Sequence, residues 1–363
     1  MSDLASKVCS LLRPEILALS AYHVPDSSGY VKLDAMENPY SWPDDMVEEW
    51  LARLREAQPN RYPDPSCNRL KAKLREAYGV PEEADLLMGN GSDEIIQIIL
   101  MALQGRDATV LAPEPTFVMY RQIASCLGLK FVGVPLREAD FALDMDAMRE
   151  AIETHRPAVI FLAYPNNPTG NLFHTDDVAE ILQIAPGLVV LDEAYTAYAG
   201  RSFMPRLAEF DRLLVMRTLS KLGLAGLRLG FLAGAKAWID EFDKIRLPYN
   251  VNVLTQISTE FAIEKRSVLE AQVGLILQDR QYLYEELGRL SGVQVYQSDA
   301  NFILFRLLRH DANQVFRKLK DSGVLIKNLH PSGGRLVGCL RVTIGMPEEN
   351  RKFLKALANV LAS

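Results

Sequence analysis

The sequence predicts an α/β fold, in which a mostly parallel sheet is wound with helices and a smaller α+β domain lies beside it. In the middle third of the 363-residue chain, short apolar runs alternate with helical patterns, which is typical of parallel strands joined by crossover helices. The expected strands are residues 109–112, 131–134, 158–163, 188–191 and 213–216. After Pro248, a long helical pattern covers about residues 253–290.

The C-terminal part of the chain mixes strand and helix patterns, as expected for a second and smaller domain. Its expected strands are residues 301–305, 324–326 and 340–344, and its expected helices are residues 314–320 and 347–361. We expect residues 61–250 to form the large domain and residues 251–363 the small domain, while residues 1–60 form an N-terminal arm and part of the small domain. The proline-rich residues 59–65 are expected to form a crossing loop.

The composition argues against several classes of protein. The net charge of −6 contains no block of like charges, so neither nucleic-acid binding nor attachment to a membrane surface is expected. The four cysteines and five histidines lack the spacing of a disulfide framework or a zinc site, so no metal is expected. Charged residues interrupt residues 2–19, which leaves no signal peptide or membrane span there. We expect a cytoplasmic protein whose partners are small molecules.

Three of the expected strands end in polar segments, namely residues 164–170, 192–195 and 218–221. Ligands of open α/β sheets bind at the carboxyl ends of strands, so these segments are expected to converge. Lys221 offers an amine for a Schiff base with pyridoxal phosphate (PLP), and Thr218 and Ser220 offer hydroxyls. Arg228 offers a guanidinium fork for a phosphate. An isolated serine-lysine pair, by contrast, is usually solvated surface.

Two further segments carry groups that PLP requires. The run Gly91-Ser92-Asp93-Glu94 precedes a helical pattern, so backbone amides at a helix N-terminus would face an anion; a plain helix cap by Ser92 or Asp93 explains the same run. Asp192 follows an apolar strand, where a buried carboxylate keeps a pyridine nitrogen protonated. The same strand resembles the magnesium-binding strand of P-loop ATPases, but the chain contains no Gly-x-x-x-x-Gly-Lys-Ser/Thr.

Two aromatic residues have both a functional and a structural interpretation. Phe117 follows an expected strand and would place its ring against a pyridine ring, although packing in the core is as common for such a residue. Tyr195 would donate its hydroxyl to the oxygen on the cofactor ring, as would the amide of Asn167; the alternative for Tyr195 is a core tyrosine with a satisfied hydroxyl.

Together these segments resemble the fold type I PLP-dependent aminotransferases, and the resemblance to the histidinol-phosphate aminotransferase branch runs almost from end to end. The segments that carry it are residues 37–40, 61–65, 91–94, 115–120, 166–170, 192–195, 217–228, 301–302, 340–345 and 348–350. The resemblance implies a mostly parallel seven-stranded sheet wound with helices, and a smaller α+β domain. It also implies a homodimer with composite active sites.

The resemblance assigns a role to each matching residue. Lys221 would form the Schiff base and then carry the proton, Asp192 would pair with the pyridine nitrogen, and Tyr195 and Asn167 with the ring oxygen. Phe117 would stack on the ring, and Tyr62 would reach the phosphate from the other subunit. The remaining phosphate contacts would come from Gly91, Ser92, Asp93, Glu94, Thr218, Ser220 and Arg228. The substrate contacts would come from Arg341, which clamps the α-carboxylate of glutamate, and from Lys327, Asn38 and Tyr22.

The chain departs from the branch at three positions. The arginine after the lysine usually lies eight residues on, whereas here 228 minus 221 gives seven, so the turn must adjust for Arg228 to reach the phosphate. Met36 stands where an asparagine is usual. Lys327 stands where many members have a second arginine; it keeps the positive charge but loses the fork that selects phosphate.

The resemblance implies transfer of the amino group of L-glutamate to imidazole acetol phosphate, giving L-histidinol phosphate and 2-oxoglutarate in histidine biosynthesis. Two alternatives use the same scaffold, a broad aromatic aminotransferase and a threonine-phosphate decarboxylase. A regulatory protein that binds PLP without turnover is a fourth possibility, but such proteins usually carry a basic DNA-binding domain, for which this chain has no segment.

Overall fold

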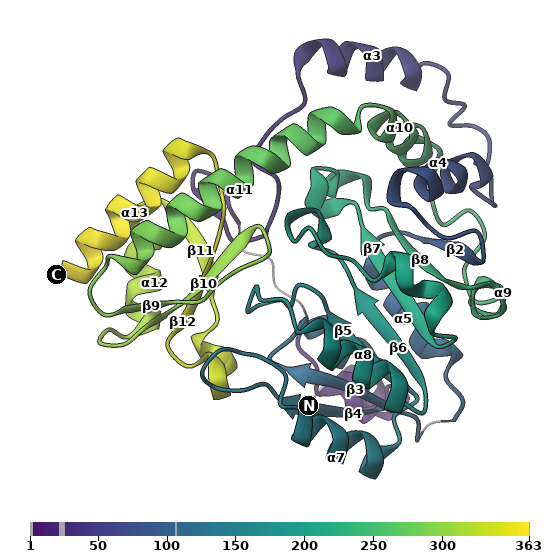
Figure 1. The fold of residues 1–363 in the computed structure, drawn as a ribbon, viewed down its shortest axis with the longest axis horizontal. Helices are drawn as coiled ribbons and strands as arrows, with labels where there is room; N and C mark the ends of the chain where they lie inside the picture. Colours follow the sequence, from purple (N-terminus) through teal and green to yellow (C-terminus); the bar gives the residue numbers. More distant parts are fainter. Residues whose placement is uncertain (1–2, 22–25, 106, 363) are drawn as a thin grey trace.

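The computed structural model describes residues 3–21, 26–105 and 107–362, and its core is a seven-stranded sheet (Figure 1). The strands are β2 (Ala84–Gly89), β3 (Thr109–Glu114), β4 (Lys130–Pro135), β5 (Val159–Ala163), β6 (Leu188–Asp192), β7 (Leu213–Thr218) and β8 (Gly230–Ala235). Their order is β2-β8-β7-β6-β5-β3-β4, with β8 antiparallel to both of its neighbours and all other pairs parallel. The predicted α/β class and mostly parallel sheet are confirmed.

Helices cover both faces of this sheet. One face packs against α4 (Asn68–Tyr78), α7 (Met145–His155) and α8 (Thr175–Ile184), and the other against α5 (Ser92–Ala102), α6 (Val118–Leu127) and α9 (Lys236–Asp243). Every residue of β5 and β6 is buried. A strand buried on both faces is apolar throughout, which is why the sequence pattern predicted β3, β5, β6 and β7 correctly. The edge strand β4 is only partly buried and was predicted from the mostly apolar residues 131–134.

In the seven-stranded sheet, β2 and β8 are the two strands that the apolar periodicity did not predict. Strand β8 contains Gly230 and Gly234, and glycine is depleted in strands because it loses backbone entropy and packs no side chain. The structure shows why residue 230 is a glycine, because a Cβ there would lie only 2.8 Å from the backbone nitrogen of Ser92. A glycine at this position lets β8 pack against the first residue of α5.

The smaller sheet has five strands, β1 (Val31–Leu33), β9 (Val293–Val295), β10 (Phe302–Leu307), β11 (Val324–Asn328) and β12 (Cys339–Thr343). Their order is β1-β11-β12-β10-β9, and only β1 and β11 are parallel. Helices α12 (Ala312–Asp321) and α13 (Pro347–Ala362) pack against one another beside this sheet. The predicted elements of this α+β domain are present, whereas β1 and β9, of three residues each, are too short to show a period.

The single helical stretch predicted over residues 253–290 is two helices, α10 (Val253–Glu264) and α11 (Arg266–Gly288), which meet at Lys265. The prediction of one helix was wrong because the break at Lys265 lets the two helices pack against different partners, which the apolar periodicity does not reveal. Helix α10 contacts α3 (Asp44–Leu54) and α4, while α11 contacts α13. At the N-terminus, α1 (Asp3–Leu11) precedes α2 (Pro14–Leu17), which contacts α6. None of the helices in the described ranges is long and apolar enough to cross a membrane.

Candidate active site

The ends of β5, β6 and β7 meet at one edge of the large sheet, where a pocket opens. The strand register aligns these ends, because Ala163 pairs with Asp192 and Asp192 pairs with Met216. The pocket has a volume of about 110 Å³. It is lined by Met36, Ser92, Asp93, Phe117, Ala163, Pro165, Asn167, Asp192, Ala194, Tyr195, Thr218, Ser220, Lys221 and Arg228. The three polar segments of the sequence therefore converge as expected.

Asp192, the last residue of β6, presents a buried carboxylate to this pocket. It is 4% exposed, and burial raises the pKa of its carboxyl to about 6. The Tyr120 hydroxyl donates to Asp192 Oδ2 at 2.6 Å, and the Ala194 amide donates to Oδ1 at 3.2 Å. Both hydrogen bonds favour the ionised carboxylate against burial. The role of Tyr120 was not predicted; its place in α6 one turn after Phe117 was the available signal.

Lys221 presents its amine to the same pocket from the short 3-10 helix Ser220–Leu222. Its Nζ donates to the backbone carbonyl of Ala35 at 3.1 Å. Burial lowers the pKa of Lys221 to about 8, and the positive charge of Arg341 adds to this effect. The unprotonated fraction of this amine near neutral pH is therefore larger than for an ordinary lysine, and the unprotonated amine is the state that a nucleophile or a proton acceptor needs.

The first turn of α5 and the loop after β7 form a cradle for an anion. Helix α5 begins at Ser92, after Gly91 with φ 83, and no side chain caps its N-terminus. The alternative that Ser92 or Asp93 is a plain helix cap is therefore wrong. The Thr218 hydroxyl donates to Ser220 Oγ at 2.9 Å. Free amides, hydroxyls and a helix N-terminus together favour a phosphate.

Arg228 reaches this cradle in spite of the short spacing from Lys221. Its Nη1 lies 3.4 Å from Ser220 Oγ and its Nη2 lies 3.6 Å from Asp93 Oδ2. The turn adjusts through the backbone of Arg228 itself, which is left-handed at φ 51 and ψ 44. A Cβ on Gly91 would lie 2.7 Å from Arg228 Nη2, so a glycine at 91 makes room for the guanidinium.

Arg341 on β12 joins the small sheet to the pocket. Its Nη1 donates to Asn167 Oδ1 at 2.5 Å, and its Nη2 donates to the Asp34 carbonyl at 3.0 Å. The Asn167 amide in turn donates to Tyr195 Oη at 3.2 Å. Burial raises the pKa of Tyr195, which keeps its hydroxyl neutral. This chain of contacts places a guanidinium beside two residues that line the pocket.

Lys327 and Met36, two departures from the expected pattern, both lie near Arg341. Lys327 is half-buried and stands opposite Arg341 across β11 and β12. Burial lowers the pKa of Lys327, with a further contribution from the Arg341 charge. Met36 has φ 53, and its carbonyl accepts from the Asn301 amide at 3.0 Å. Met36 lines the pocket itself, whereas the cation pair is not among the lining residues and reaches the pocket through the contact of Arg341 with Asn167.

Asn38, Glu94 and Tyr62, which were predicted for the site, are not among the residues that line the pocket. The amide of Asn38 donates to the Leu222 carbonyl and to Gln272 Oε1, at 3.2 and 2.9 Å. The Glu94 carboxylate accepts from Asn250 at 2.7 Å, which leaves only its backbone for an anion. Tyr62 is 80% exposed, and its ring stacks on that of Tyr249 with centroids 4.3 Å apart. Tyr22 lies outside the described residues.

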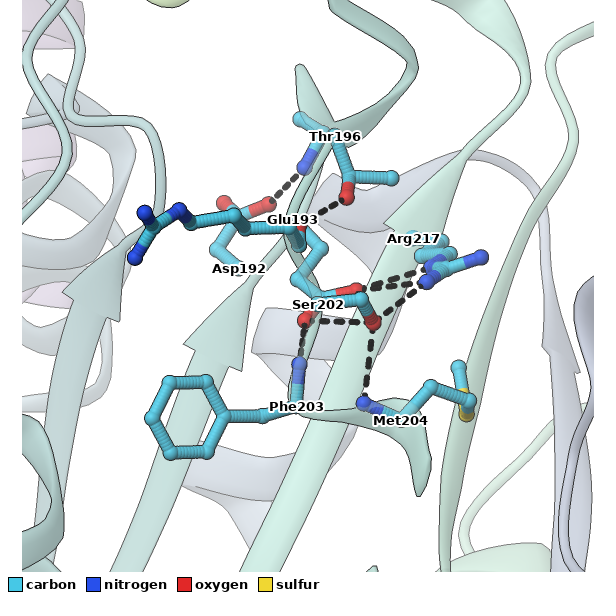
Figure 2. Close-up of polar contacts among 9 residues, drawn as sticks. Asp192, Glu193, Thr196, Ser202, Phe203, Met204 and Arg217 are labelled. Carbon is cyan, nitrogen blue, oxygen red and sulfur yellow. Dashed lines mark hydrogen bonds and ion pairs between the residues drawn. The ribbon is translucent and has the colours of Figure 1, made fainter. Parts of the chain in front are cut away.

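A buried ion pair directly behind the pocket was not predicted (Figure 2). Glu193 Oε2 accepts from Arg217 Nε and Nη2 at 2.9 and 2.7 Å, and Glu193 Oε1 accepts from the Phe203 amide at 2.6 Å. The Ser202 hydroxyl lies within hydrogen-bond distance of both partners. Glu193 follows Asp192 and Arg217 precedes Thr218, so the pair ties the end of β6 to the end of β7 next to the candidate site.

Comparison with known proteins gives the family. The sequence pattern of the family described as aminotransferase class I and II matches residues 28–357. Histidinol-phosphate aminotransferase 2 of Nitrosococcus oceani is 56% identical over 351 residues, which cover 97% of each chain. Histidinol-phosphate aminotransferase 1 of Ralstonia nicotianae is 52% identical over 363 residues, covering 99% of this chain and 96% of the relative.

Solved structures agree with this assignment at the level of the fold. Histidinol-phosphate aminotransferase from Sinorhizobium meliloti in complex with pyridoxal-5'-phosphate superposes with a TM-score of 0.87 at 23% identity, covering 97% of this chain and 98% of that one. A putative aminotransferase from Burkholderia pseudomallei gives 0.78 at 28% identity, covering 92% and 99%. The predicted fold type I architecture is thereby confirmed. The chain belongs to the class I and II aminotransferases and, within them, to the histidinol-phosphate aminotransferases.

Proposed function

We propose that this enzyme uses PLP to transfer the amino group of L-glutamate to imidazole acetol phosphate, giving L-histidinol phosphate and 2-oxoglutarate. One observation carries the cofactor assignment: a buried carboxylate (Asp192), an amine of lowered pKa (Lys221) and an anion cradle (Ser92, Thr218 and Arg228) line one pocket. The substrate assignment follows from relatives of this activity at 49–56% identity over nearly the full chain.

The groups present match the three functional parts of PLP. Asp192 would hold the protonated pyridine nitrogen, Lys221 the aldehyde, and the cradle at the start of α5 the phosphate. Phe117 lines the pocket and would lie against the ring, while Tyr195 and Asn167 would bind its oxygen. When bound, PLP carries the amino group between the two substrates and withdraws electrons from the substrate α-carbon.

The chain itself supplies positioning and proton transfer. Lys221 would bind the cofactor aldehyde through its amine, and in the unprotonated state, which its lowered pKa favours, that amine would accept the proton of the substrate α-carbon. Arg341 would take the α-carboxylate of glutamate in a two-pronged hydrogen bond, which its contact with Asn167 aims at the ring. Burial of this site excludes water and strengthens each of these interactions.

Recognition of the second substrate falls to Lys327. This ammonium lies beside Arg341 and would bind the phosphate of histidinol phosphate. Two anions of different geometry, a carboxylate and a phosphate, use this region in turn. A compact ammonium with freely rotating donors accommodates both better than a second rigid fork.

The proposal includes a homodimer with composite sites in the cytoplasm. Tyr62 and Tyr249 form an exposed aromatic pair, which is a surface suited to a second copy of the chain. Tyr62 would then donate its hydroxyl to the cofactor phosphate of the neighbouring subunit. A reducing cytoplasm suits the four cysteines, which are all free thiols.

Product analysis in a single turnover tests the function. The enzyme charged with PLP should convert L-histidinol phosphate to imidazole acetol phosphate, and added 2-oxoglutarate should then yield glutamate. Phenylalanine and O-phospho-L-threonine are the comparison substrates. Equal turnover of phenylalanine would favour a broad aromatic aminotransferase, and release of carbon dioxide from O-phospho-L-threonine would favour a decarboxylase; either result replaces the proposal.

A further inference from the structure

A second and larger cavity lies behind the candidate active site. Its volume is about 340 Å³, which is in the range of small-molecule sites, against about 110 Å³ for the first pocket. It is bounded by the end of α4, the loop that follows β6, the end of β7 and the junction of α10 with α11. Ala194 and Thr218 line both cavities, so the two lie back to back.

Most of the wall of this rear cavity is apolar. The apolar side chains are Leu222, Leu224, Ala262, Ile263, Leu269 and Val273. They come from the segment after Lys221 and from helices α10 and α11. A compact hydrophobic body would remove this surface from water, which is favourable in proportion to the area covered.

Arg217 contributes hydrogen-bond donors that the protein leaves unused. Its Nε and Nη2 are engaged by Glu193 and Ser202, but Nη1 has no acceptor among the residues that the structure describes. Figure 2 shows this nitrogen pointing away from the Glu193 carboxylate. Arg217 lines the cavity and is only 7% exposed. Arg217 Nη1 is not among the fully buried atoms without a partner, so it is accessible from the cavity, where a ligand or water can accept from it.

Tyr78 provides a second unused donor in the same wall. Its ring lies under the Arg217 guanidinium, 5.3 Å from ring centroid to Cζ. In the described ranges, the Tyr78 hydroxyl has no hydrogen-bond partner. Burial raises the pKa of Tyr78 to about 12, so the hydroxyl stays protonated and remains a donor at neutral pH. Two adjacent hydrogen-bond donors without acceptors favour a ligand oxygen that accepts hydrogen bonds and donates none, such as a carboxylate oxygen.

The charges around the cavity select a single negative charge. The Arg217 charge is neutralised by Glu193, and that of Arg266 by Glu270 at 2.7 Å. Arg201 also lines the cavity; it is exposed, and no ion pair engages it in the described part of the chain. One unbalanced positive charge matches a carboxylate, whereas a phosphate ester near −2 would remain undercompensated.

We propose that the rear cavity is a binding site for a small monocarboxylic acid with a compact hydrophobic body, whose carboxylate accepts from Arg217 Nη1 and Tyr78 Oη. Arg201 supplies the compensating charge at the mouth. The body lies against Ile263, Leu269 and the other apolar side chains of the wall. Lys221 and Asp192, the amine and the carboxylate of the first pocket, are not among the residues that line this cavity, so we assign its occupant as a ligand and not a substrate.

Calorimetric titration of the PLP-loaded enzyme with 3-phenylpropionate tests the proposal. The wild type should bind it saturably, and the uncharged analogue 3-phenylpropanamide should bind about tenfold more weakly or worse. The double variant Tyr78→Phe/Arg201→Gln should weaken binding of the acid by at least about tenfold, since the Tyr78 hydrogen bond and the compensating charge are both lost. Ile263→Trp, which fills the cavity, should abolish it.

The active site is the competing location for this acid, and a separate variant distinguishes the two. Arg341→Gln should leave binding of 3-phenylpropionate intact if the acid occupies the rear cavity. Thermal unfolding and the rate of the glutamate half-reaction establish that the Tyr78, Arg201 and Ile263 variants are folded and charged with cofactor. Loss of binding in Arg341→Gln with retention in Ile263→Trp, or no saturable binding to the wild type at millimolar concentrations, would overturn the proposal.

Discussion

Tyr120 donates a hydrogen bond of 2.6 Å to Asp192, and both side chains are buried, at 0% and 4% exposure. The Tyr120 ring also lies at right angles to Phe117, with centroids 5.5 Å apart, and stacks on Phe161. One tyrosine therefore holds the Asp192 carboxylate, which we propose pairs with the pyridine nitrogen, and supports the aromatic residue that lines the same pocket. This contact lowers the pKa of Asp192, in opposition to burial.

Replacing Tyr120 by phenylalanine should weaken PLP binding without removing any group that touches the cofactor. The loss of one hydrogen bond to a carboxylate is worth about 1.5–3 kcal/mol. The pKa of Asp192, already about 6, should rise further, so that the decline of PLP affinity on acidification begins at a higher pH. Equilibrium binding of PLP at a series of pH values checks this. An unchanged acid limb in Tyr120→Phe would show that the hydroxyl does not hold the charge of Asp192.

Lys221 should react with electrophiles at a lower pH than an ordinary lysine. Burial lowers its pKa from 10.5 to about 8, so the unprotonated amine grows as the pH rises through 8 and is nearly complete well below 10. In the cofactor-free enzyme, labelling of Lys221 by fluorodinitrobenzene should follow a titration with its midpoint at about 8. Peptide mass spectrometry measures this labelling, with the exposed Lys236 as an internal control. A midpoint near 10 would contradict the shift.

Lys327 and Arg341 should affect different half-reactions. Lys327→Ala should reduce kcat/KM for histidinol phosphate by an amount equivalent to about 1.5–3 kcal/mol, the value of a charged hydrogen bond, and should leave the glutamate half-reaction nearly intact. Arg341→Ala should slow the glutamate half-reaction most, because the α-carboxylate of glutamate loses both of its hydrogen bonds to the guanidinium. Rapid-mixing measurements of each half-reaction separate the two effects. An equal loss in both half-reactions for Lys327→Ala would remove the phosphate role.

The Glu193–Arg217 pair should stabilise the fold only as a pair. Arg217→Leu leaves Glu193 buried without its counter-charge, which should lower the free energy of unfolding by about 3–5 kcal/mol. The double variant Glu193→Leu/Arg217→Leu should lose less, because neither charge remains buried. Denaturant unfolding gives these values, and the exposed pair Lys236–Asp240 is the matched control, for which Lys236→Gln should cost at most about 0.5 kcal/mol. A double variant less stable than Arg217→Leu would refute this account.

Tyr62 should act across the subunit boundary. Tyr62→Phe should weaken PLP binding by about 1.5–3 kcal/mol, the value of a hydrogen bond to a charged phosphate. Mixing Lys221→Ala with Tyr62→Ala chains should restore activity, since a hybrid dimer has one site with both native residues. Tyr282→Phe, at another exposed tyrosine, is the control and should have no effect. A fully active monomer in sedimentation experiments is the result that this arrangement does not allow.

Strands β3 to β7 and the chemistry at their ends could be predicted because both are local in the sequence. A parallel strand buried on both faces is an apolar run, and the polar groups lie at or shortly after its end. Asp192 is the last residue of β6, and Lys221 lies three residues after the end of β7. The interruption at Lys265 and the three-residue strands β1 and β9 escaped prediction. Strand β1 depends on a neighbour that is distant in the chain, since it pairs with β11 nearly 300 residues on. Strand β9 pairs with the nearby β10, and its three residues are too few to show a period.

The amino-acid sequence by itself determined the fold class and the family, and it predicts which groups would face PLP, because each of these rests on residue types at short spacing. Tertiary structure alone decided which groups support them. Tyr120 meets Asp192 across 72 residues, Glu193 meets Arg217 across 24, and Arg341 meets Asn167 across 174. Hydrogen bonds and ion pairs act over a few ångströms, so partners this far apart in the chain are brought together only by the packing of the two sheets and their helices.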